Sequence, residues 1–474
     1  MELSHLNILL IEDDPDFTEE IKRHVSALCS DPNYSIADCV ESATQLIETS
    51  FFDLIILDLK LPSSPGAMDS DPQHGRNLLD TALAAAPGTP VFMLTGSSAE
   101  QFLHEIIQLS TQVDVWGQGK ALPLIGFLPK HRLDRLDEVI KPYIDGCDAA
   151  AEIELNTHNE LTISESRLIK IFTASVGGVF CNVSRLGGGL SGTSVFKLGV
   201  IDSNGAPIHN SVAKIGLPAD IKDEVERHDR YISRLQPNAT PRLVKVLNHG
   251  AKVTSGVFYS LATASELNGY SFIHEGSDIV IERITTCLQP WNDAAINQRI
   301  TVGDIRRTFI DDANFNAVKN LITHDWAERF ENNLVLVKWG CVHGDLHGLN
   351  VLVTNESIPV LIDYGDVGEC ASSRDPVTFE LSVFFHPEGP LKDSEWPTAD
   401  EALLWGTPEF VTNTCSTPSY FNKCRQWSEV ISAGKRERAA VAYGYLARQL
   451  KYPGTNKKRV NDFLLGVKRL FDNA

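Results

Sequence analysis

Apolar runs of strand length alternate with amphipathic segments along the first 145 residues. Five apolar runs predict strands, and each is followed by a segment of helical period. The predicted strands are LNILLIED, YSIADCV, FDLIILDLKLP, TPVFMLTG and LIGFLPK. The predicted helices that follow them are, in the same order, FTEEIKRHVSALCS, SATQLIETS, GRNLLDTALAAAP, SAEQFLHEIIQLS and RLDRLDEVIKPYI. Because the strands are apolar throughout, both faces of their sheet must be covered. Residues 1–145 are therefore predicted to be an α/β domain with a doubly wound, five-stranded parallel sheet.

The pattern changes twice beyond this point. Residues 146–178 contain the small, acidic stretch DGCDAAAEIELNTHNE and the amphipathic ISESRLIKIFTASVGG, which predict a linker and a connecting helix. Residues 179–265 show strand-length runs around a glycine-rich turn, and residues 266–474 are mostly helical in period. A small β-rich lobe followed by a large helical lobe predicts a two-lobed α+β domain over 179–474.

Composition limits the classes of function. The chain has 474 residues, which is enough for two or three domains, and no apolar run approaches the 18 residues of a membrane span. The N-terminus lacks the basic and apolar regions of a signal peptide, and nine cysteines without a CxxC spacing indicate a reducing, cytoplasmic location. A formal net charge of −20 argues against nucleic acid as a partner.

Ionic and hydroxyl residues stand at the carboxyl ends of the predicted strands. Glu12 and Asp13 follow the first strand, Asp58 ends the third, and Thr95 and Lys130 end the fourth and fifth. These ends meet at one edge of a parallel sheet, where ligands bind. Three carboxylates there call for a hard cation such as Mg²⁺, and one of them could attack phosphorus while a hydroxyl and an ammonium bind the phosphoryl oxygens. The alternative is an acidic edge that binds Mg²⁺ alone or nothing.

With these five positions in order, residues 5–143 resemble the receiver domain of two-component response regulators. The resemblance implies that Asp58 is the phosphoacceptor, that Glu12 and Asp13 hold Mg²⁺ with help from the Lys60 carbonyl, and that a sensor histidine kinase is the partner. Phe127 matches the aromatic switch position. A homodimer is the oligomeric state that receivers suggest.

Two stretches are longer than is usual in that family. One is LPSSPGAMDSDPQHG after Asp58, and the other is TQVDVWGQGKALP before the fifth strand. His131 also stands where the family usually has proline. These departures concern the surface that meets a partner more than the phosphorylation chemistry.

A second set of polar residues lies in HGDLHGLN and LIDYGD. Asp345 and Asn350 are five residues apart, and Asp363 follows thirteen residues later. Phosphoryl transfer from ATP needs a group that positions the acceptor and oxygens that bind metal ions. Asp345 can accept or orient the acceptor's proton, and Asn350 and Asp363 can present oxygens to Mg²⁺.

A glycine-rich loop and a lysine precede this set, as phosphoryl transfer from ATP also requires. In LGGGLSGTSVF, Gly188, Gly189, Ser191 and Gly192 would let the backbone approach phosphates closely. Lys214 lies in the next predicted strand, SVAKIG. Each feature is weak alone, because glycine hairpins and strand lysines are common.

Taken together, residues 180–474 resemble the aminoglycoside and choline phosphotransferase branch of the protein-kinase-like fold. HGD replaces the protein-kinase HRD, IDYGD stands where DFG would, SSRDPVTFELSVF resembles the helix that follows, and FYSLATASELNG would be the hinge around adenine. The resemblance implies ATP and Mg²⁺ as cofactors and a glutamate paired with Lys214. Glu224 and Glu226 are the candidates, although the family register falls nearer His228; Glu224 is preferred because it lies one turn earlier on the same helix face.

Gly344 bears on regulation. Kinases that are controlled by activation-loop phosphorylation use the arginine at this position to bind the phosphate, which glycine cannot do, so control is expected to come from the receiver. The predicted function is a response regulator in which phosphorylation of Asp58 regulates an ATP-dependent phosphotransferase acting on a hydroxyl acceptor, a small molecule or a protein. The alternative is a receiver–pseudokinase scaffold that binds nucleotide and recruits a partner without phosphotransfer. A transcription regulator is disfavoured because no basic helix-turn-helix is visible.

Two further expectations concern the acceptor side. His347 is predicted to brace its loop by hydrogen bonds without touching substrate. Aminoglycoside enzymes usually line the acceptor site with acids, and the C-terminal lobe has the acid-rich segment EGPLKDSEWPTADEAL. This segment is a candidate lining for a cationic acceptor, although acidic loops are more often simply solvated.

Overall fold

The computed structural model describes residues 6–29, 31–96, 111–188, 193–236, 240–261, 267–354, 356–411 and 414–474. The chain forms two compact units. The first comprises Met1–Lys222 and Arg242–Leu261, and the second comprises Asp223–Pro241 and Ala262–Ala474. The strands that were predicted for the small lobe therefore belong to the same compact unit as the N-terminal sheet.

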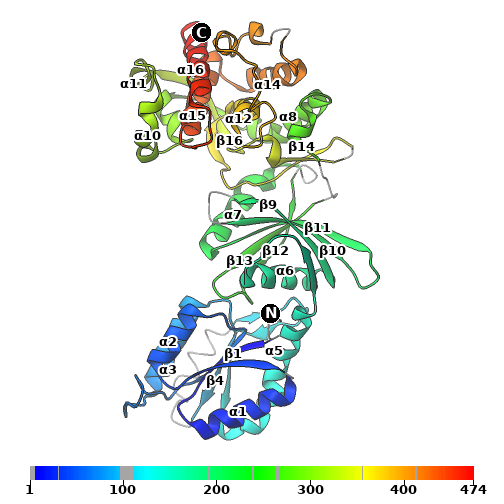
Figure 1. Ribbon diagram of the computed structural model, residues 1–474, viewed down its shortest axis with the longest axis vertical. Coiled ribbons are helices and arrows are strands. Elements are labelled where there is room, and N and C mark those ends of the chain that lie inside the picture. The colour runs from blue at the N-terminus through cyan, green and yellow to red at the C-terminus, as the bar shows by residue number, and fades with distance from the viewer. Residues whose placement is uncertain are drawn as a thin grey trace. The chain divides into compact units, whose positions relative to one another are not determined.

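The N-terminal part of the first unit contains the predicted parallel sheet (Figure 1). Its strand order is β2-β1-β3-β4-β7, and neighbouring strands pair in parallel. The strands are β1 (Leu6–Ile11), β2 (Pro32–Ala37), β3 (Leu54–Asp58), β4 (Val91–Thr95) and β7 (Ile125–Pro129). All five residues of β3 are buried, as a strand covered on both faces requires. The predicted doubly wound fold is confirmed.

The described helices that connect or follow the strands of this sheet are α1 (Pro15–Leu28), α2 (Val40–Thr49), α3 (Pro72–Ala85) and α5 (Leu136–Ala151). Asp14 caps α1, because its carboxylate accepts hydrogen bonds from the backbone N–H groups of Asp16 and Phe17. The short helix η2 (Lys130–Arg135) joins β7 to α5, and the extended stretch before β7 forms β5 (Gln112–Val113) and β6 (Leu122–Pro123). The helix predicted at 98–110 lies outside the described residues.

A six-stranded sheet follows in the same unit, in the order β12-β13-β11-β10-β9-β8. The strands are β8 (Glu154–Thr157), β9 (Phe180–Gly188), β10 (Ser194–Ile201), β11 (Pro207–Gly216), β12 (Arg242–Leu247) and β13 (Ser255–Ser260). β8 pairs in parallel with β9, whereas the other strands pair antiparallel.

The segment predicted as a linker is therefore more ordered than its composition indicated. Its first residues are the last turns of α5, in which Cys147 and Ala150 are fully buried. β8 is an edge strand in which exposed and half-buried residues alternate, which explains why ELNT lacks an apolar run. The predicted connecting helix is α6 (Ile163–Ser175). Phe172 of α6 stacks on Phe258 of β13 with ring centroids 4.2 Å apart.

The second unit is mostly helical, as predicted for residues beyond 266. The division between the units falls within α7 (Pro218–Tyr231), whose residues from Asp223 onward belong to the second unit. The other helices of this unit are α8 (Ser277–Asp293), α9 (Val302–Arg307), α10 (Asp312–Val318), α11 (Ala327–Phe330), α12 (Arg374–Phe385), α13 (Ala399–Ala402), α14 (Pro418–Ile431), α15 (Lys435–Gln449) and α16 (Lys457–Asp472). Its short strands are β14 (Leu267–Asn268), β15 (Ile296–Thr301), β16 (Leu334–Val342), β17 (Val351–Val353), β18 (Pro359–Leu361) and β19 (Gly368–Ala371). All twelve residues of α12, the helix that follows the two polar motifs, are buried, so it forms the centre of this core.

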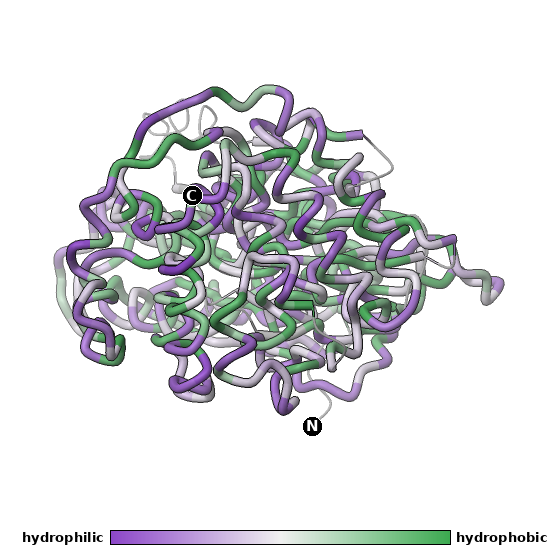
Figure 2. Tube along the Cα trace, turned by 90° about the horizontal axis from the view of Figure 1, so that it is seen from above, coloured by the Kyte–Doolittle hydropathy of each residue, from purple (hydrophilic) through white to green (hydrophobic). Residues whose placement is uncertain are grey.

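Hydrophobic and hydrophilic residues alternate at short intervals along the trace (Figure 2). Among the described residues, no helix combines the length and the apolar character that crossing a membrane would require.

Candidate functional site

The acidic residues predicted at the sheet edge come together there. Oxygen atoms of Glu12, Asp13 and Asp58 lie within 4.8 Å of one another. The ammonium of Lys130, directly after β7, donates to Glu12 Oε2 at 2.7 Å and to Asp58 Oδ2 at 2.8 Å. Thr95 is the last residue of β4 at the same edge, and its side chain lies outside the description.

Burial shifts the pKa values of the ionisable groups in this cluster. The pKa of Glu12 is raised to about 7, first by burial and then by the negative charge of Asp58, against the opposing effect of Lys130. Burial also raises the pKa of Asp58, and Lys130 again opposes the shift. Burial alone would lower the pKa of Lys130, but the two carboxylates hold it above its usual value. One ammonium is thus shared between two buried acids, and a second cation would relieve their repulsion.

The residues present fit a bound Mg²⁺ ion and a phosphoryl group. Asp58 Oδ1 is buried and accepts no hydrogen bond from the side chains that the structure describes, which is costly unless a ligand uses it. Asp58 lines a cavity of about 530 Å³ together with Glu12, Asp13, Lys60 and Lys130. Ser70 of the extended loop after β3 also lines the cavity, and its hydroxyl lies 3.5 Å from Asp13 Oδ2. Loop length signalled the insertion, but nothing in the sequence placed Ser70 at the site.

In the second unit, α12 clamps the HGD loop. Asp375 accepts the backbone N–H groups of His343 at 2.8 Å and Gly344 at 3.0 Å. Arg374 donates from Nε to the Gly344 carbonyl at 2.8 Å. Gly344 has φ +87°, and a Cβ atom there would lie 2.1 Å from the Asp366 carbonyl oxygen. The glycine that distinguishes HGD from HRD is therefore required by the local backbone.

Asp345, Asn350 and Asp363 lie on segments that hydrogen bonds tie together. The Asn350 amide donates to the Asp345 carbonyl at 2.9 Å, and the Ile362 N–H donates to the Asn350 carbonyl at 2.9 Å. Asp363, the next residue, is exposed and has φ +61°. A non-glycine residue in this conformation is strained, and such strain concentrates at functional sites.

Arg448 of α15 pairs with Asp345, which sequence reasoning missed. Its Nη1 donates to Asp345 Oδ1 at 2.9 Å, and its Nη2 lies 3.6 Å from Asp366 Oδ2. Burial alone would raise the pKa of Asp345, but Arg448 and then the neighbouring histidines hold it below its usual value. Burial lowers the pKa of His347 to about 4, and its ring packs against His386 with centroids 4.4 Å apart. Asp345 is thus ionised, and at neutral pH Arg448 is the group that balances its charge.

The remaining predicted nucleotide-binding residues divide between the units. Gly188 ends β9, and Gly189, Ser191, Gly192 and part of the predicted hinge lie outside the described residues. Lys214 lies in β11 of the first unit, where it is opposite Val257 of β13.

The glutamate candidates for Lys214 lie on α7 in the second unit. Glu224 is buried and Glu226 is exposed. Burial, and then the charges of Cys287 and Glu224, raise the pKa of Tyr364, the neighbour of Asp363. Also on α7, Arg227 donates from Nη1 to the carbonyls of Gly365 at 2.8 Å and Val367 at 3.2 Å. α7 therefore holds the loop that follows Asp363, a role that the sequence did not indicate.

A buried junction joins the receiver-like sheet to the six-stranded sheet within the first unit. Arg167 of α6 donates from Nη2 to Asp53 Oδ1 at 2.6 Å, and the Asn7 N–H donates to Asp53 Oδ2 at 2.8 Å. Trp116, from the extended stretch before β7, is buried, with the Arg167 guanidinium 5.7 Å from its ring centroid. A Cβ on Gly250, in the turn between β12 and β13, would contact Trp116 at 3.7 Å. The second insertion is thus a docking element between the two sheets.

Known proteins resemble the two parts of the chain separately. No protein-family model and no curated protein matches it. It is similar to a CheY-like response regulator receiver domain protein from Methanospirillum hungatei JF-1, with 21% identity and a TM-score of 0.22, over 30% of this chain and 95% of that chain. It is similar to the non-phosphorylated HemR receiver domain from Leptospira biflexa, with 26% identity and a TM-score of 0.21, over 28% and 94% of the two chains.

A third solved structure corresponds to the other resemblance. It is an aminoglycoside-3'-phosphotransferase of type VIII, with 15% identity and a TM-score of 0.30, and the match covers 52% of this chain and 93% of that chain.

Proposed function

We propose that this chain is a two-component response regulator whose output is an ATP-dependent phosphotransferase. The observation that carries the proposal is that one chain contains two separate sets of residues whose chemistry suits phosphoryl transfer. One is the buried Asp58 carboxylate beside Lys130, and the other is the Asp345–Asn350–Asp363 set on its hydrogen-bonded loops.

In the receiver, Asp58 would take a phosphoryl group from a sensor histidine kinase. No side chain that the structure describes donates to its Oδ1, so its lone pairs are available to phosphorus. Lys130 already contacts the other oxygen of Asp58 and would then bind a phosphoryl oxygen. Glu12 and Asp13 would hold Mg²⁺, which supplies the charge that neutralises the carboxylates and phosphoryl oxygens when it is bound.

In the kinase-like part, ATP with Mg²⁺ would be the phosphoryl donor. Asn350 and Asp363 would present oxygens to the metal, Gly188 and Lys214 would contribute from the small-lobe strands, and Asp345 would orient the acceptor hydroxyl. The low pKa of Asp345 suits a residue that orients the hydroxyl and accepts its proton only late in the transfer.

Regulation would pass through the junction in the first unit. Lys130 is the first residue of η2, which leads directly into α5, and α5 packs against α6. A phosphoryl group on Asp58 would compete with Glu12 for the Lys130 ammonium, and so would shift the start of this helical path. α6 packs against β13 of the six-stranded sheet, so the path ends at the strands that carry Gly188 and Lys214.

One observation favours the alternative, a receiver–pseudokinase scaffold. Arg448 neutralises Asp345, and a carboxylate engaged in a 2.9 Å ion pair is a poorer proton acceptor than a free one. If Arg448 occludes Asp345 permanently, the kinase-like part would bind nucleotide and recruit a partner without transferring phosphate.

ATP hydrolysis and autophosphorylation with Mg²⁺, measured with and without beryllofluoride to mimic phospho-Asp58, test the proposal. We expect turnover in the wild type, a change on adding beryllofluoride, and loss of turnover in Asp363→Ala. Asp472→Ala, which removes an exposed carboxylate at the end of α16, is the matched control and should behave as wild type. Nucleotide binding without turnover in any state would contradict the proposed phosphotransferase activity and support the receiver–pseudokinase scaffold.

A further inference from the structure

Arg448 contacts the carboxylate of Asp345, the residue proposed to orient the acceptor hydroxyl. The guanidinium contacts Asp345 Oδ1 through Nη1 at 2.9 Å, whereas its contact from Nη2 to Asp366 is long, at 3.6 Å. The Asp366 side chain is 50% exposed, so this partner can leave at little cost. The guanidinium is thus bound to Asp345 on one side, and its other neighbours are the Tyr452 hydroxyl and the solvated carboxylate of Asp366.

The helix that carries Arg448 is fixed at its first turn. Glu437 of α15 is fully buried and accepts three backbone N–H groups, from Lys338 at 2.9 Å, Ser373 at 3.1 Å and Ala433 at 2.7 Å. These donors lie in β16, beside α12 and before α15, so one carboxylate ties α15 to the segments that also position the HGD loop.

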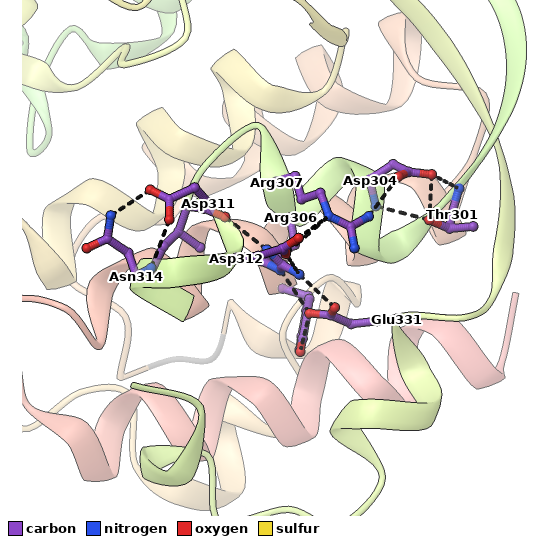
Figure 3. A network of polar contacts seen from close by, with 10 residues as sticks. Thr301, Asp304, Arg306, Arg307, Asp311, Asp312, Asn314 and Glu331 are labelled. Atoms are coloured by element: carbon purple, nitrogen blue, oxygen red, sulfur yellow. Dashed lines mark hydrogen bonds and ion pairs between the residues drawn. The ribbon is translucent and has the colours of Figure 1, made fainter. Parts of the chain in front are cut away.

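A second anchor holds the middle of α15. Tyr443 donates its hydroxyl to Glu331 Oε1 at 3.2 Å, and Arg306 binds both oxygens of Glu331 at 3.0 Å. Figure 3 shows Arg306 between Glu331 and Asp312, within a larger network that joins α9, α10 and α11. Because α15 is anchored in this way, Arg448 is preorganised beside Asp345.

The two imidazoles beside Asp345 favour neither a cationic nor an anionic acceptor. His347 and His386 both have pKa values lowered by burial, so at neutral pH they add no charge. Within the acid-rich segment expected to line a cationic site, Glu388 lies beside His386, and its charge opposes the lowering of that pKa, whereas other parts of the segment are engaged elsewhere. Arg459 of α16 binds the carbonyls of Leu391 and Lys392, and the carboxylate of Glu401 closes the capping box of α13.

We propose that Arg448 binds an anionic group on the acceptor, so that the acceptor is a hydroxyl compound bearing a carboxylate or a phosphate. The inference rests on the proposed phosphotransferase function and names its substrate class. The anion would replace Asp366 on the guanidinium and leave Asp345 free to take the hydroxyl. Since Arg448 and Asp345 are in direct contact, the hydroxyl must stand one or two carbons from the anionic group.

Every bond and proton in the proposed transfer is accounted for by the two substrates and Asp345. The acceptor oxygen forms a bond to the γ-phosphorus of ATP, the bond from that phosphorus to the ADP oxygen breaks, and the hydroxyl proton passes to Asp345. Arg448 touches the acceptor's anion and takes no part in the proton transfer. The ion pair with Asp345 is then the acceptor-free state of a working site, in which the arginine keeps a partner until the anion arrives.

The test compares three-carbon hydroxyl compounds that differ in charge. ADP release with Mg²⁺ and ATP would be measured with glycerol, D-glycerate, glycerol 3-phosphate and 3-amino-1,2-propanediol, on wild type, Arg448→Gln and Arg448→Lys. The matched control is Arg436→Gln, an exposed arginine on the same helix. Protein folding would be checked by circular dichroism in each variant.

We expect D-glycerate or glycerol 3-phosphate to exceed the neutral and cationic compounds by about tenfold or more in kcat/KM, since a charge-assisted hydrogen bond is at stake. The two anionic arms show whether a carboxylate or a phosphate is taken. Arg448→Gln should abolish this ratio, Arg448→Lys should keep part of it, and Arg436→Gln should retain it.

Preference for the amine, or equal rates for all four compounds, would overturn the inference. So would an anion preference that survives in Arg448→Gln. ATP hydrolysis with water as acceptor distinguishes failure of the acceptor assignment from failure of the proposed phosphotransferase function. Hydrolysis without a preference for anionic compounds would contradict the acceptor assignment alone. Complete absence of hydrolysis would contradict the phosphotransferase function itself.

Discussion

Arg167 of α6 and Asp53, the residue before β3, form a buried ion pair at 2.6 Å. It joins the amino end of the receiver-like sheet to the helix that packs on the six-stranded sheet. The Asp53 side chain is fully buried and that of Arg167 is 11% exposed, so each charge depends on the other for its solvation. The two parts of the first unit are therefore coupled at the end of the sheet opposite Asp58.

Removing one partner of this pair should destabilise the first unit. We expect Arg167→Met to lower the free energy of unfolding by about 3–5 kcal/mol, because Asp53 would be left as an uncompensated buried charge. Urea unfolding followed by fluorescence measures the change. The double variant Asp53→Asn with Arg167→Met should recover part of the loss, because no buried charge remains.

The matched control is an exposed ion pair in the same unit. Lys141 and Asp145 on α5 lie 2.7 Å apart with both side chains 56% exposed. Lys141→Met should change stability by about 0.5 kcal/mol or less. Equal losses for the buried and the exposed pair would contradict the role assigned to Arg167.

Trp116 should be needed for signal transmission. A Cβ on Gly146 of α5 would lie 2.3 Å from the Trp116 ring, and a Cβ on Gly117, where φ is +72°, would lie 2.3 Å from the Ile171 carbonyl. The indole thus fills the space between α5, α6 and the β12–β13 turn. In Trp116→Ala we expect ATP hydrolysis to continue while its response to beryllofluoride shrinks to less than half. An unchanged response in the folded variant would show that the signal takes another path.

Local pattern was enough to predict the receiver-like site. Glu12, Asp58 and Lys130 each follow a buried apolar strand, and parallel strands bring their carboxyl ends together whatever the rest of the fold does. Asp345, Asn350 and Asp363 lie on segments that short hydrogen-bonded turns connect, but whether they form the predicted site stays a prediction.

The contacts that tune these sites were not predictable in this way. Arg448 is 103 residues from Asp345, and Arg227 is 138 residues from Gly365. Helical period says which face of α15 or α7 is buried, but tertiary packing alone decides which loop that face meets. Trp116 was visible only as part of an insertion, and β8 was missed because an edge strand that is half-buried shows no apolar run.

Magnesium affinity of the receiver should fall as the pH is lowered. Burial and Asp58 raise the pKa of Glu12 to about 7, so the carboxylate is mostly ionised at pH 8 and mostly protonated at pH 6. A protonated acid must lose its proton before it binds the cation, so we expect about tenfold weaker Mg²⁺ binding at pH 6 than at pH 8. Isothermal titration calorimetry measures both values.

Glu12→Gln provides the control for this titration. Its amide does not ionise, so Mg²⁺ binding should be weaker at pH 8 but nearly independent of pH between 6 and 8. A wild-type affinity that does not change over this range would show that Glu12 is already ionised at pH 6, and that burial does not control it.

Arg227 should control the loop that carries Asp363. It is the α7 residue that donates to both Gly365 and Val367, and hydrogen bonds from a charged donor are worth about 1.5–3 kcal/mol. In Arg227→Ala the loop loses this support, so the strained conformation of Asp363 should no longer be held. We expect kcat/KM for ATP hydrolysis to fall by about ten- to a hundredfold, as the lost free energy implies.

Hydrogen exchange distinguishes this effect from general destabilisation. Amides of residues 364–367 should exchange faster in Arg227→Ala, while those of α12 and α15 keep their protection. Arg230→Ala, which removes an exposed arginine three residues further along α7, should change neither exchange nor turnover. Normal turnover in Arg227→Ala would mean that the backbone alone holds Asp363 at φ +61°, and that α7 does not communicate with the metal-binding loop through this side chain.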